Sequence, residues 1–274
     1  MLVSLQTFAT DNEYGLKDNI QDGVILHCFD WTYAQIKEEL PNIAAAGFSA
    51  VQTSPAHPRE PVGAAWYMLY QPYDYKVGEN GLGTKEGLTE LCTEAHQYGV
   101  KIIVDVVANH TNGSLSYVAS FWQDQSLYHD YQGGIDYSNR WQVTHGRLGM
   151  WDLKTENSRV QEKIKEYVAE LKSCGVDGIR WDAAKHIGLP SEGDTFWQNV
   201  PDQTMYNYGE ILDGTGGDDT VSEKVEVVSQ TTGVQLHPVA GESSAKAMIY
   251  NLQGQRVDAN YHGVVVCNGR KYVQ

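Results

Sequence analysis

A cation and a carboxylate stand two residues apart in Gly178-Ile-Arg-Trp-Asp-Ala-Ala-Lys-His186. If this stretch enters as a strand, Arg180 and Asp182 project to the same side, because side chains alternate along a strand. A neighbouring cation favours the charged form of a carboxyl group. An ionised, oriented carboxylate at a strand end can attack carbon, bind a metal or anchor a loop, and a purely structural ion pair is the fourth alternative.

Two other stretches place carboxylates after apolar runs. They are Asp105-Val-Val-Ala-Asn-His110 and Gly209-Glu-Ile-Leu-Asp213. Carboxyl ends of parallel strands meet at one edge of a sheet, which is where barrel enzymes carry their catalytic groups. We therefore expect one site from residues at these strand ends: Asp105, Asn109, His110, Arg180, Asp182, His186 and Glu210.

The elements that must position these residues alternate between strand and helix. Strands are expected at 24–31, 48–52, 100–107, 176–181 and 205–210, with helices beginning near Thr32, Thr84 and Ser158 and a short one at 195–199. Pro41 should kink or split the first helix. The alternation predicts an α/β fold with a parallel sheet and outer helices. A (β/α)8-type TIM barrel is favoured over a doubly wound sheet, because the turns contain no G-x-G-x-x-G and no P-loop.

The barrel is expected to stop after about strand five. We place a partial barrel at 20–214 with an insertion at about 109–150, a linker at 215–223, and a small antiparallel β module at 224–274. Strands of that module are expected at 224–228, 247–252 and 263–267. An eight-stranded barrel needs about 250 residues. A five-stranded version would leave the edges of its first and fifth strands unpaired.

Composition narrows the class of ligand. Among 274 residues, 35 are acidic and 20 basic, a formal net charge of −15 that disfavours nucleic acid as a partner. The 7 Trp and 17 Tyr suit a neutral sugar, although aromatic residues also fill cores. No apolar run is long enough to span a membrane. The start lacks the pattern of a signal peptide.

The cysteines point away from disulfides and zinc. The chain has four, Cys28, Cys92, Cys174 and Cys267, far apart and without a C-x-x-C pair. We therefore expect buried free thiols rather than a disulfide framework or a zinc site.

In order and form, the three motifs resemble three of the four signature regions of the α-amylase family of retaining glycoside hydrolases (glycoside hydrolase family 13). Trp66-Tyr-Met-Leu-Tyr-Gln-Pro72 resembles the aromatic floor of that family, and the insertion at 109–150 resembles its B domain. The resemblance covers roughly 22–214. It implies cleavage of α-1,4-glucosidic bonds in starch-like glucans by a protein that is secreted or held at the cell surface.

The resemblance also assigns roles. Retaining hydrolysis needs two carboxyl groups about 5–5.5 Å apart, one a nucleophile and one a proton donor. Asp182 would be the nucleophile, with Arg180 favouring its ionised form, and Glu210 the general acid/base. Glu210 has no cation near it in the sequence, which suits a group that must carry a proton. Asp105 is expected to pair with Arg180 rather than to bind substrate.

Substrate contacts and a metal follow from the same resemblance. It places the sugar against Trp66, Tyr70 and His110, and the sugar beyond the cleavage point against Lys185 and His186. It further implies a structural calcium between barrel and B domain. The ligands would be the side chains of Asn109 and Asp152 and the backbone carbonyl of His186, with another carbonyl near Val143. Calcium takes six to eight oxygen ligands.

The sequence departs from the family after strand five. The fourth region, an Asn-His-Asp or similar triplet, is absent between Gly214 and Gln274, and with it an aspartate that binds sugar hydroxyls in the transition state. We interpret the chain as a barrel front half joined to a C-terminal tail by deletion or fragmentation. The tail resembles sorting modules of the type IX secretion route; a carbohydrate-binding or structural β module is the alternative.

Three functions follow from these patterns. The first is an α-amylase-like endohydrolase, impaired by the missing third acid. The second is a non-catalytic α-glucan-binding protein that keeps the aromatic floor, and the third is an interaction module in which only the tail matters. Their common expected partner, for the first two, is a starch-like α-glucan.

Overall fold

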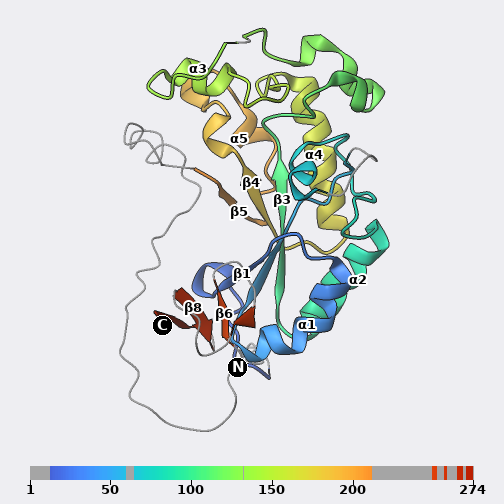
Figure 1. Cartoon of the computed structure of the whole chain (residues 1–274), viewed down its shortest axis with the longest axis vertical. Helices are drawn as coiled ribbons and strands as arrows, with labels where there is room; N and C mark the ends of the chain where they lie inside the picture. Colours follow the sequence, from blue (N-terminus) through green and yellow to red (C-terminus); the bar gives the residue numbers. More distant parts are fainter. Residues whose placement is uncertain are drawn as a thin grey trace, which may run out of the picture.

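Five parallel strands form the sheet that positions the candidate site (Figure 1). The computed structural model describes residues 13–59, 65–131 and 133–211, together with the backbone of short strands between 249 and 273. The strands lie in chain order: β1 (Ile25–Cys28), β2 (Ala50–Thr53), β3 (Lys101–Val107), β4 (Gly178–Asp182) and β5 (Tyr206–Gly209). The predicted alternation of strands and helices, and the parallel sheet, are confirmed.

The register of the sheet brings the predicted site residues to adjacent strands. Asp105 on β3 is the partner of Arg180 on β4, and Val107 is the partner of Asp182. Trp181 is the partner of Gly209 on β5, so Glu210 follows β5 beside the end of β4. Because side chains alternate, Asp105, Arg180 and Asp182 all face the side of the sheet that would be the interior of a barrel.

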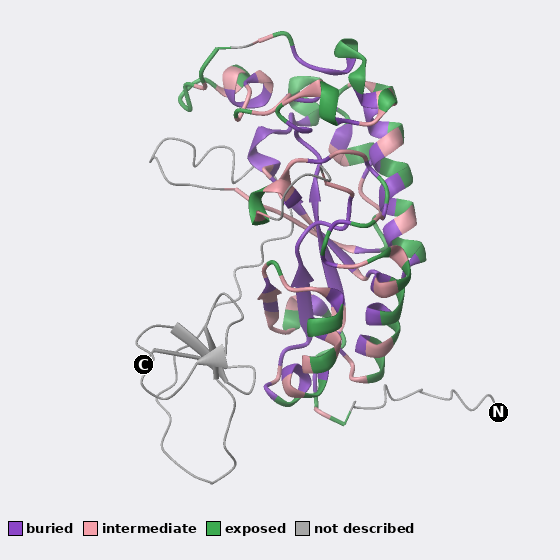
Figure 2. Cartoon of the chain, turned by 45° about the vertical axis from the view of Figure 1, so that its right-hand side comes forward, coloured by how far each residue is buried: buried purple, intermediate pink, exposed green. Residues whose placement is uncertain are grey.

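Helices cover the other face of the sheet. They are α1 (Tyr33–Ala45), α2 (Lys85–Gln97), α4 (Ser158–Ser173) and the short α5 (Phe196–Asn199). Their apolar stripes are buried while their outer sides are exposed, and the strands between them are largely buried (Figure 2). Thr32 caps α1 in a capping box with Gln35, as its position before the apolar stripe suggests.

Of the two effects predicted for Pro41, a kink or a split of the first helix, the split is wrong. The helix α1 continues through Pro41 to Ala45. Pro41 lies on the exposed side, where water can bond with the carbonyl that the ring leaves without a partner. Leu40 and Ile43, both fully buried, pack the same stretch onto the core. Tertiary packing therefore outweighs the local cost of the proline.

The insertion between β3 and α4 is made of short helices and loops. It contains η3 (Leu115–Tyr117), η4 (Ser120–Gln123), η5 (Gln125–Leu127) and α3 (Arg140–His145). Isolated bridges join His110 to Asp152 and Tyr128 to Leu153, so both ends of the insertion are tied together. Trp122, Tyr128 and Val143 are buried within it. The insertion is thus a packed unit rather than a loose loop.

Two faces of the sheet are buried by different residues. The main core contains Val51, Val104 and Trp181 beneath the helices. A smaller cluster of Ile20, Ala50 and Ile103 lies on the opposite face, with Ile25, Tyr206 and Tyr208 packed against it. This second face carries the polar residues of the candidate site nearer the carboxyl ends.

A separate antiparallel sheet is formed in the C-terminal part. Its strands are β6 (Ile249–Asn251), β7 (Arg256–Val257), β8 (Val264–Cys267) and β9 (Arg270–Val273), in the order β7-β6-β8-β9. The antiparallel strands expected at 247–252 and 263–267 are confirmed. The linker at 215–223 and the strand at 224–228 lie outside the described residues, and the domain limits and sorting role stay predictions.

Two other expectations concern cysteines and membranes. Cys28, Cys92 and Cys174 are free and buried, as predicted, while the Cys267 side chain lies outside the described residues. In the described part of the chain, no helix has the length and apolarity needed to cross a bilayer.

Two glycines offer a matched test of helix-end packing. Gly175 follows α4 with φ +95°, and Gly193 has φ +93°. An added Cβ would lie 3.0 Å from the Cβ of Cys92 at Gly175, but would meet no atom within 4 Å at Gly193. We expect Gly193→Ala to cost about 1–2 kcal/mol for its left-handed backbone, and Gly175→Ala to cost more in urea unfolding. Equal losses would contradict the predicted clash.

Candidate active site

One guanidinium group holds three carboxylates together at the carboxyl end of the sheet. The Nη1 atom of Arg180 lies 2.9 Å from Oδ1 of Asp182 and 3.3 Å from Oδ1 of Asp105. Its Nη2 atom lies 2.6 Å from Oε1 of Glu210. The side chain of Arg180 is 13% exposed, so these contacts are largely shielded from water. The structure therefore brings together Arg180, Asp182 and Glu210, and pairs Asp105 with Arg180 as predicted.

Backbone geometry after β4 and β5 fixes the two candidate catalytic carboxyl groups. Ala183 follows Asp182 in the left-handed conformation, with φ +49°, and turns the chain at the strand end. Its backbone N–H donates to Oε2 of Glu210 at 3.1 Å. The N–H of Glu210 donates to the carbonyl of Trp181 at 2.8 Å. The turn at Ala183 thus carries one carboxylate and orients the other.

The expectation that Glu210 stands away from any cation is wrong. Arg180 is 30 positions earlier in the chain but contacts Glu210 directly. The cause is the pairing of β4 with β5, which places Arg180 beside Tyr208 and brings Glu210 within reach. Distance along the sequence therefore gave the wrong environment for the candidate proton donor.

Burial changes the expected charge of the other two carboxyl groups. Burial raises the pKa of Asp182 to about 6, the Arg180 cation opposes this, and the Glu210 carboxylate adds to it. Burial likewise raises the pKa of Asp105 to about 7, again against the effect of Arg180. Arg180 favours ionised Asp182, as expected, but burial outweighs it. Although burial disfavours the charge on Arg180, the surrounding carboxylates raise its pKa.

A second layer of polar side chains fixes Asp105. Tyr70 donates from its hydroxyl group to Oδ2 of Asp105 at 2.7 Å, and Gln52 donates from Nε2 to Oδ1 at 3.0 Å. The hydroxyl group of Tyr208 in turn donates to Oε1 of Gln52. Gln52 and Tyr208 were missed by the sequence reasoning. Their strand-alternate positions, on the same side as Arg180, were the available signal.

A cavity of about 690 Å³ opens beside the carboxylates. One wall is aromatic, with Phe29, Trp66, Tyr67 and Tyr70, and Tyr137, Leu148 and Met150 of the insertion line it as well. The predicted catalytic and substrate residues all line this cavity: Trp66, Tyr70, His110, Arg180, Asp182, Lys185, His186 and Glu210. The sequence reasoning missed His27, Phe29, Tyr67 and the three insertion residues. An acidic edge with an aromatic wall is suited to a neutral ligand with apolar faces.

Two histidines line the cavity as neutral rings. Burial lowers the pKa of His110 to about 4, and burial also lowers that of His186 to about 4. His110 donates from Nε2 to the carbonyl of Tyr70 at 3.1 Å, and His186 donates from Nδ1 to the carbonyl of Val143 at 2.8 Å. The other nitrogen of each neutral ring is an acceptor. In His110 that nitrogen, Nδ1, lies 3.4 Å from Nδ2 of Asn109, which donates to it. A neutral histidine can accept a hydrogen bond from a sugar hydroxyl group.

The predicted calcium ligands Asn109 and Asp152 lie side by side. Both are 1% exposed, and Nδ2 of Asn109 donates to Oδ1 of Asp152 at 3.0 Å. Burial raises the pKa of Asp152 to about 6. The hydrogen bonds shown for Asn109 use its amide nitrogen, so its amide oxygen is left for a ligand. A buried carboxylate beside an amide oxygen fits calcium chemistry.

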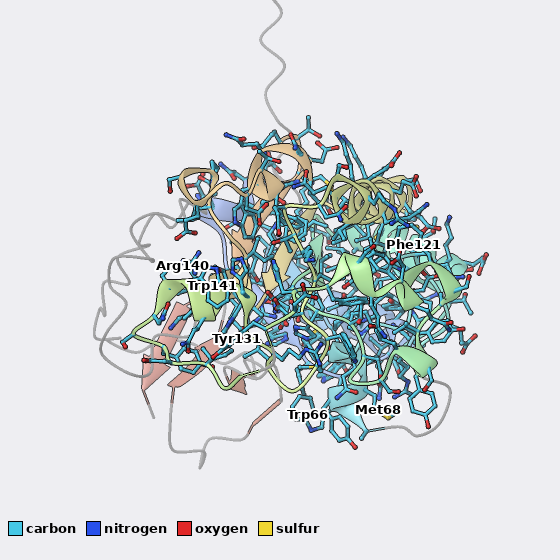
Figure 3. The ribbon with its side chains drawn as sticks, turned by 90° about the horizontal axis from the view of Figure 1, so that it is seen from above. Trp66, Met68, Phe121, Tyr131, Arg140 and Trp141 are labelled. Carbon is cyan, nitrogen blue, oxygen red and sulfur yellow. The ribbon has the colours of Figure 1, made fainter. Side chains whose placement is uncertain are left out.

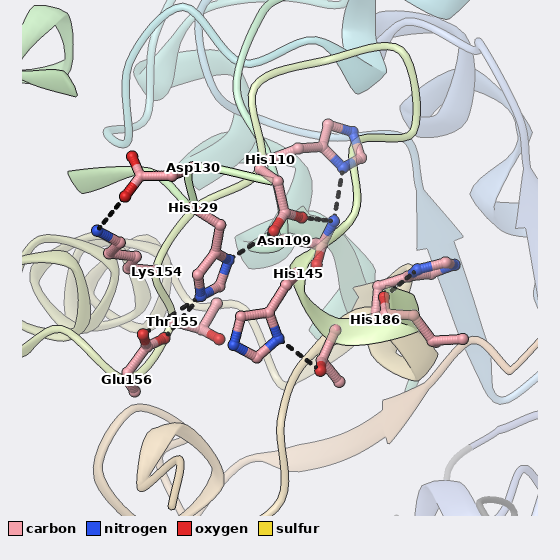
Figure 4. Close-up of polar contacts among 12 residues, drawn as sticks. Asn109, His110, His129, Asp130, His145, Lys154, Thr155, Glu156 and His186 are labelled. Atoms are coloured by element: carbon pink, nitrogen blue, oxygen red, sulfur yellow. Dashed lines mark hydrogen bonds and ion pairs between the residues drawn. The ribbon is translucent and has the colours of Figure 1, made fainter. Parts of the chain in front are cut away.

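Two contacts around these ligands were not expected. His129 lies 2.6 Å from Oδ2 of Asp152 through its Nδ1 atom. Through its Nε2 atom it lies 3.2 Å from Glu156 (Figure 4). Burial disfavours its charge, but the two carboxylates raise the pKa of His129 to about 9. The carbonyl of Val143, considered a further calcium ligand, is occupied by His186. Among the described residues, no cluster of three or more His, Cys, Asp or Glu side chains is arranged to hold a metal.

Comparisons with known proteins were made on sequence and on structure. A model of the family described as alpha amylase, catalytic domain, matches residues 30–263. An alpha-amylase of Clostridium acetobutylicum is 40% identical over 229 residues, covering 76% of this chain and 30% of that protein. An alpha-amylase of Butyrivibrio fibrisolvens is 32% identical over 246 residues, covering 75% of this chain and 25% of that protein.

The chain is also similar in structure to solved alpha-amylases. A mutant of alpha-amylase I from Eisenia fetida, in complex with maltohexaose, has a TM-score of 0.61 at 25% identity over 71% of this chain and 46% of that chain. An alpha-amylase of Malbranchea cinnamomea has a TM-score of 0.61 at 26% identity over 72% and 49%. These likenesses confirm the predicted barrel type. The chain spans less than half the length of each of these four proteins.

The cluster of Arg180 with three carboxylates makes the free energy of unfolding depend on pH. A carboxyl group whose pKa is raised by folding contributes stability below its unfolded pKa of about 4, and loses it as pH rises through the folded value. For Asp182 and Asp105 the folded values are about 6 and about 7. Removing the cation in Arg180→Gln should raise both further. We expect that variant to lose about 3–5 kcal/mol at pH 8 and clearly less at pH 5, in urea unfolding.

Arg159→Gln is the matched control for Arg180→Gln. Arg159 pairs with Asp124 at the surface and is 51% exposed, so its loss should cost at most about 1 kcal/mol. Asp124 has a pKa lowered to about 2 by hydrogen bonds from Ser126 and Arg159, so this small cost should be alike at pH 5 and pH 8. An Arg180→Gln loss that is the same at both pH values would refute the electrostatic account.

Proposed function

The chain belongs to the alpha-amylase catalytic-domain family, and on that premise we propose that it is an amylase-like retaining glycoside hydrolase acting on α-1,4-glucosidic bonds of starch-like glucans. The observation that carries the proposal is the placement of Asp182 and Glu210 on one guanidinium group, beside an aromatic-lined cavity. Two carboxyl groups close together at the wall of a sugar-sized cavity are what retaining hydrolysis requires.

In this proposal the two carboxyl groups divide the work. Asp182 attacks the anomeric carbon and forms a covalent glycosyl intermediate, while Glu210 gives its proton to the departing glycosidic oxygen. Glu210 then takes a proton from the water that releases the sugar. To act as an acid, Glu210 must first be protonated, which weakens its ion pair with Arg180. Arg180 then remains paired with Asp182 and Asp105, and it keeps the nucleophile in its charged form.

The walls of the cavity support a carbohydrate ligand. Sugar rings have apolar faces that pack on flat aromatic side chains, and Trp66, Tyr67 and Phe29 supply such surfaces here. The neutral ring of His186 offers its Nε2 atom as an acceptor for a hydroxyl group. A net charge of −15 favours an uncharged polymer over an anionic one. Because starch-like polymers do not cross membranes, we place the protein outside the cell, secreted or at the cell surface.

A second candidate function is non-catalytic binding of α-glucans. It is favoured by the direct ion pair between Arg180 and Glu210, which occupies the carboxyl group of the candidate acid. It is also favoured by the absence from the sequence of the third acidic residue of the family. On the catalytic proposal, the same absence lowers turnover, because a group that binds sugar hydroxyls in the transition state is missing. The two functions differ in turnover, not in binding.

Glu210→Gln separates the two functions. The change keeps the size of the side chain but removes its proton transfer. We expect the unmodified chain to release reducing sugar from soluble starch as the α-anomer, and Glu210→Gln to release it at least about 100-fold more slowly. Reducing-end assays and NMR of the first product measure both quantities.

Glu166→Gln is the matched control for this test. Glu166 forms an ion pair with Lys163 on the outer helix α4, and its side chain is 57% exposed, so turnover should stay within about twofold. Starch binding by the unmodified chain without turnover would favour the binding protein. Turnover that is equal in Glu210→Gln and the unmodified chain would remove Glu210 from the mechanism.

We also propose a structural calcium ion held by this chain. The side chains of Asn109 and Asp152 would bind it, together with the backbone carbonyl of His186. When bound, calcium supplies positive charge to a buried carboxylate and joins the insertion to the ends of β3 and β4. Asp152 already has a cation partner in His129, so an ion would share Asp152 with His129 or displace it.

Calcium addition and removal test that site. We expect the melting temperature to rise by several degrees with millimolar calcium and to fall on chelation, because a ligand that binds only the folded state stabilises it. Asp152→Asn should abolish the shift. Asp194→Asn is a matched control, since Asp194 is a buried carboxylate that accepts a hydrogen bond from Thr155. The melting temperature of this variant should still rise with calcium. A melting temperature that chelation leaves unchanged would argue against the site.

A further inference from the structure

An exposed aromatic cluster lies on the insertion outside the cavity. Trp141 on α3 is 54% exposed, and Tyr131 packs against it edge to face with ring centroids 5.3 Å apart. His145 lies under the indole, with centroids 4.7 Å apart and planes at 21°. We call Tyr131, Trp141 and His145 the Trp141 platform. None of the three lines the cavity, and neither the fold nor the proposed hydrolysis explains why a tryptophan is presented there.

The platform is held rigidly from below. His145 is fixed through Nδ1, which lies 3.1 Å from the carbonyl of Trp141 and 2.9 Å from Oγ1 of Thr144. His145 also packs on the ring of His129, with ring centroids 4.2 Å apart. Tyr131 is fixed by its hydroxyl group, which donates to the carbonyl of Gly134 at 3.0 Å. A flat ring fixed in place loses little entropy when a ligand stacks on it.

The helix that carries the platform is tied to the candidate active site. Arg140, next to Trp141, donates from its guanidinium to the carbonyls of Lys185 and Ile187, just beyond the nucleophile strand. Tyr137, three residues before α3 begins, lines the cavity and has the ammonium of Lys185 5.1 Å from its ring centre. Figure 3 looks down on this end of the molecule and shows Tyr131, Arg140 and Trp141 together, with Trp66 of the cavity wall on the same face.

The chemistry around the platform selects an uncharged ligand. Asp130, beside Tyr131, has a side chain that is 98% exposed, and Asp136 is also exposed. In a chain of net charge −15 this surface disfavours anions such as nucleic acid. Apolar carbon–hydrogen faces of a neutral sugar suit an indole of which one face is already covered by His145. A long polymer could contact Tyr137 in the cavity and Trp141 outside it.

We propose that the Trp141 platform is a second binding site for α-glucan polymer, outside the cavity where cleavage takes place. The proposal rests on the proposed function, because it takes its ligand class from it. The platform binds a distant segment of the glucan molecule that occupies the cavity, or a neighbouring glucan molecule of an insoluble particle. The platform lengthens the residence time of the polymer near the cavity. It does not change the turnover of short oligosaccharides.

Trp141→Ala tests the platform. We measure retardation in gels containing amylopectin, using the Glu210→Gln form so that the polymer is not consumed, and we measure maltotetraose turnover with Glu210 intact. Trp141→Ala should weaken polymer binding by about five- to tenfold, the loss of one stacked ring, with maltotetraose turnover within twofold. Trp141→Phe should recover part of the binding. Tyr117→Ala removes a ring of similar exposure, 51%, elsewhere on the insertion and should change neither quantity.

Several results would overturn the platform. They are unchanged polymer binding in Trp141→Ala, an equal loss in Tyr117→Ala, an equal fall in maltotetraose turnover, or a change of oligomeric state in sedimentation, which would indicate contact between copies. The platform and the proposed function fail separately. Polymer binding that depends on Trp141 without turnover supports the platform alone, whereas turnover with binding independent of Trp141 supports the hydrolase alone.

Discussion

The candidate active site depends on the guanidinium group of Arg180, which is largely shielded from water. Arg180 contacts three carboxylates within a site that is mostly closed to water. Without it, Asp105, Asp182 and Glu210 would be like charges facing one another in a low dielectric, where repulsion is far stronger than in water. Arg180 does not fully offset the cost of burying its partners, since burial still raises the pKa of Asp105 to about 7 and that of Asp182 to about 6. These two raised values belong to the candidate nucleophile and to its buried neighbour, whereas Glu210, the proposed proton donor, bonds with the same cation.

The inner face of the sheet changes from apolar to polar along the strands, and Arg180 lies in the polar part. Ile103 and Ala50 fill its lower part, and Gln52, Asp105 and Arg180 follow two residues further along their strands. The polar layer is satisfied internally, since Tyr70, Gln52 and Tyr208 bond with Asp105 or with each other. A half-satisfied layer would cost more than an apolar one. The position of Asp105 is thus set before any ligand arrives.

The features that could be predicted from the sequence are those set by residues close together in the chain. Strand alternation is local, so the pair of Arg180 and Asp182 could be predicted from two positions. The alternation of elements gave the parallel sheet, and three motifs in order indicated the family that the comparisons confirm. The ion pair of Arg180 with Glu210 depends on strand register, and the contact of His129 with Asp152 on the packing of the insertion. Neither leaves a local pattern. Pro41 was misjudged for the same reason, because packing of the helix decided its effect.

The insertion and the strand ends form one mechanical unit. Arg140 reaches from α3 to the carbonyls after β4, and His186 reaches back to the carbonyl of Val143 in α3. These contacts run in both directions between the same two segments, so a shift of the loop after the candidate nucleophile would break contacts with α3. Asp152, at the far end of the insertion, is joined to Asn109 after β3. The insertion therefore clamps the ends of two neighbouring strands.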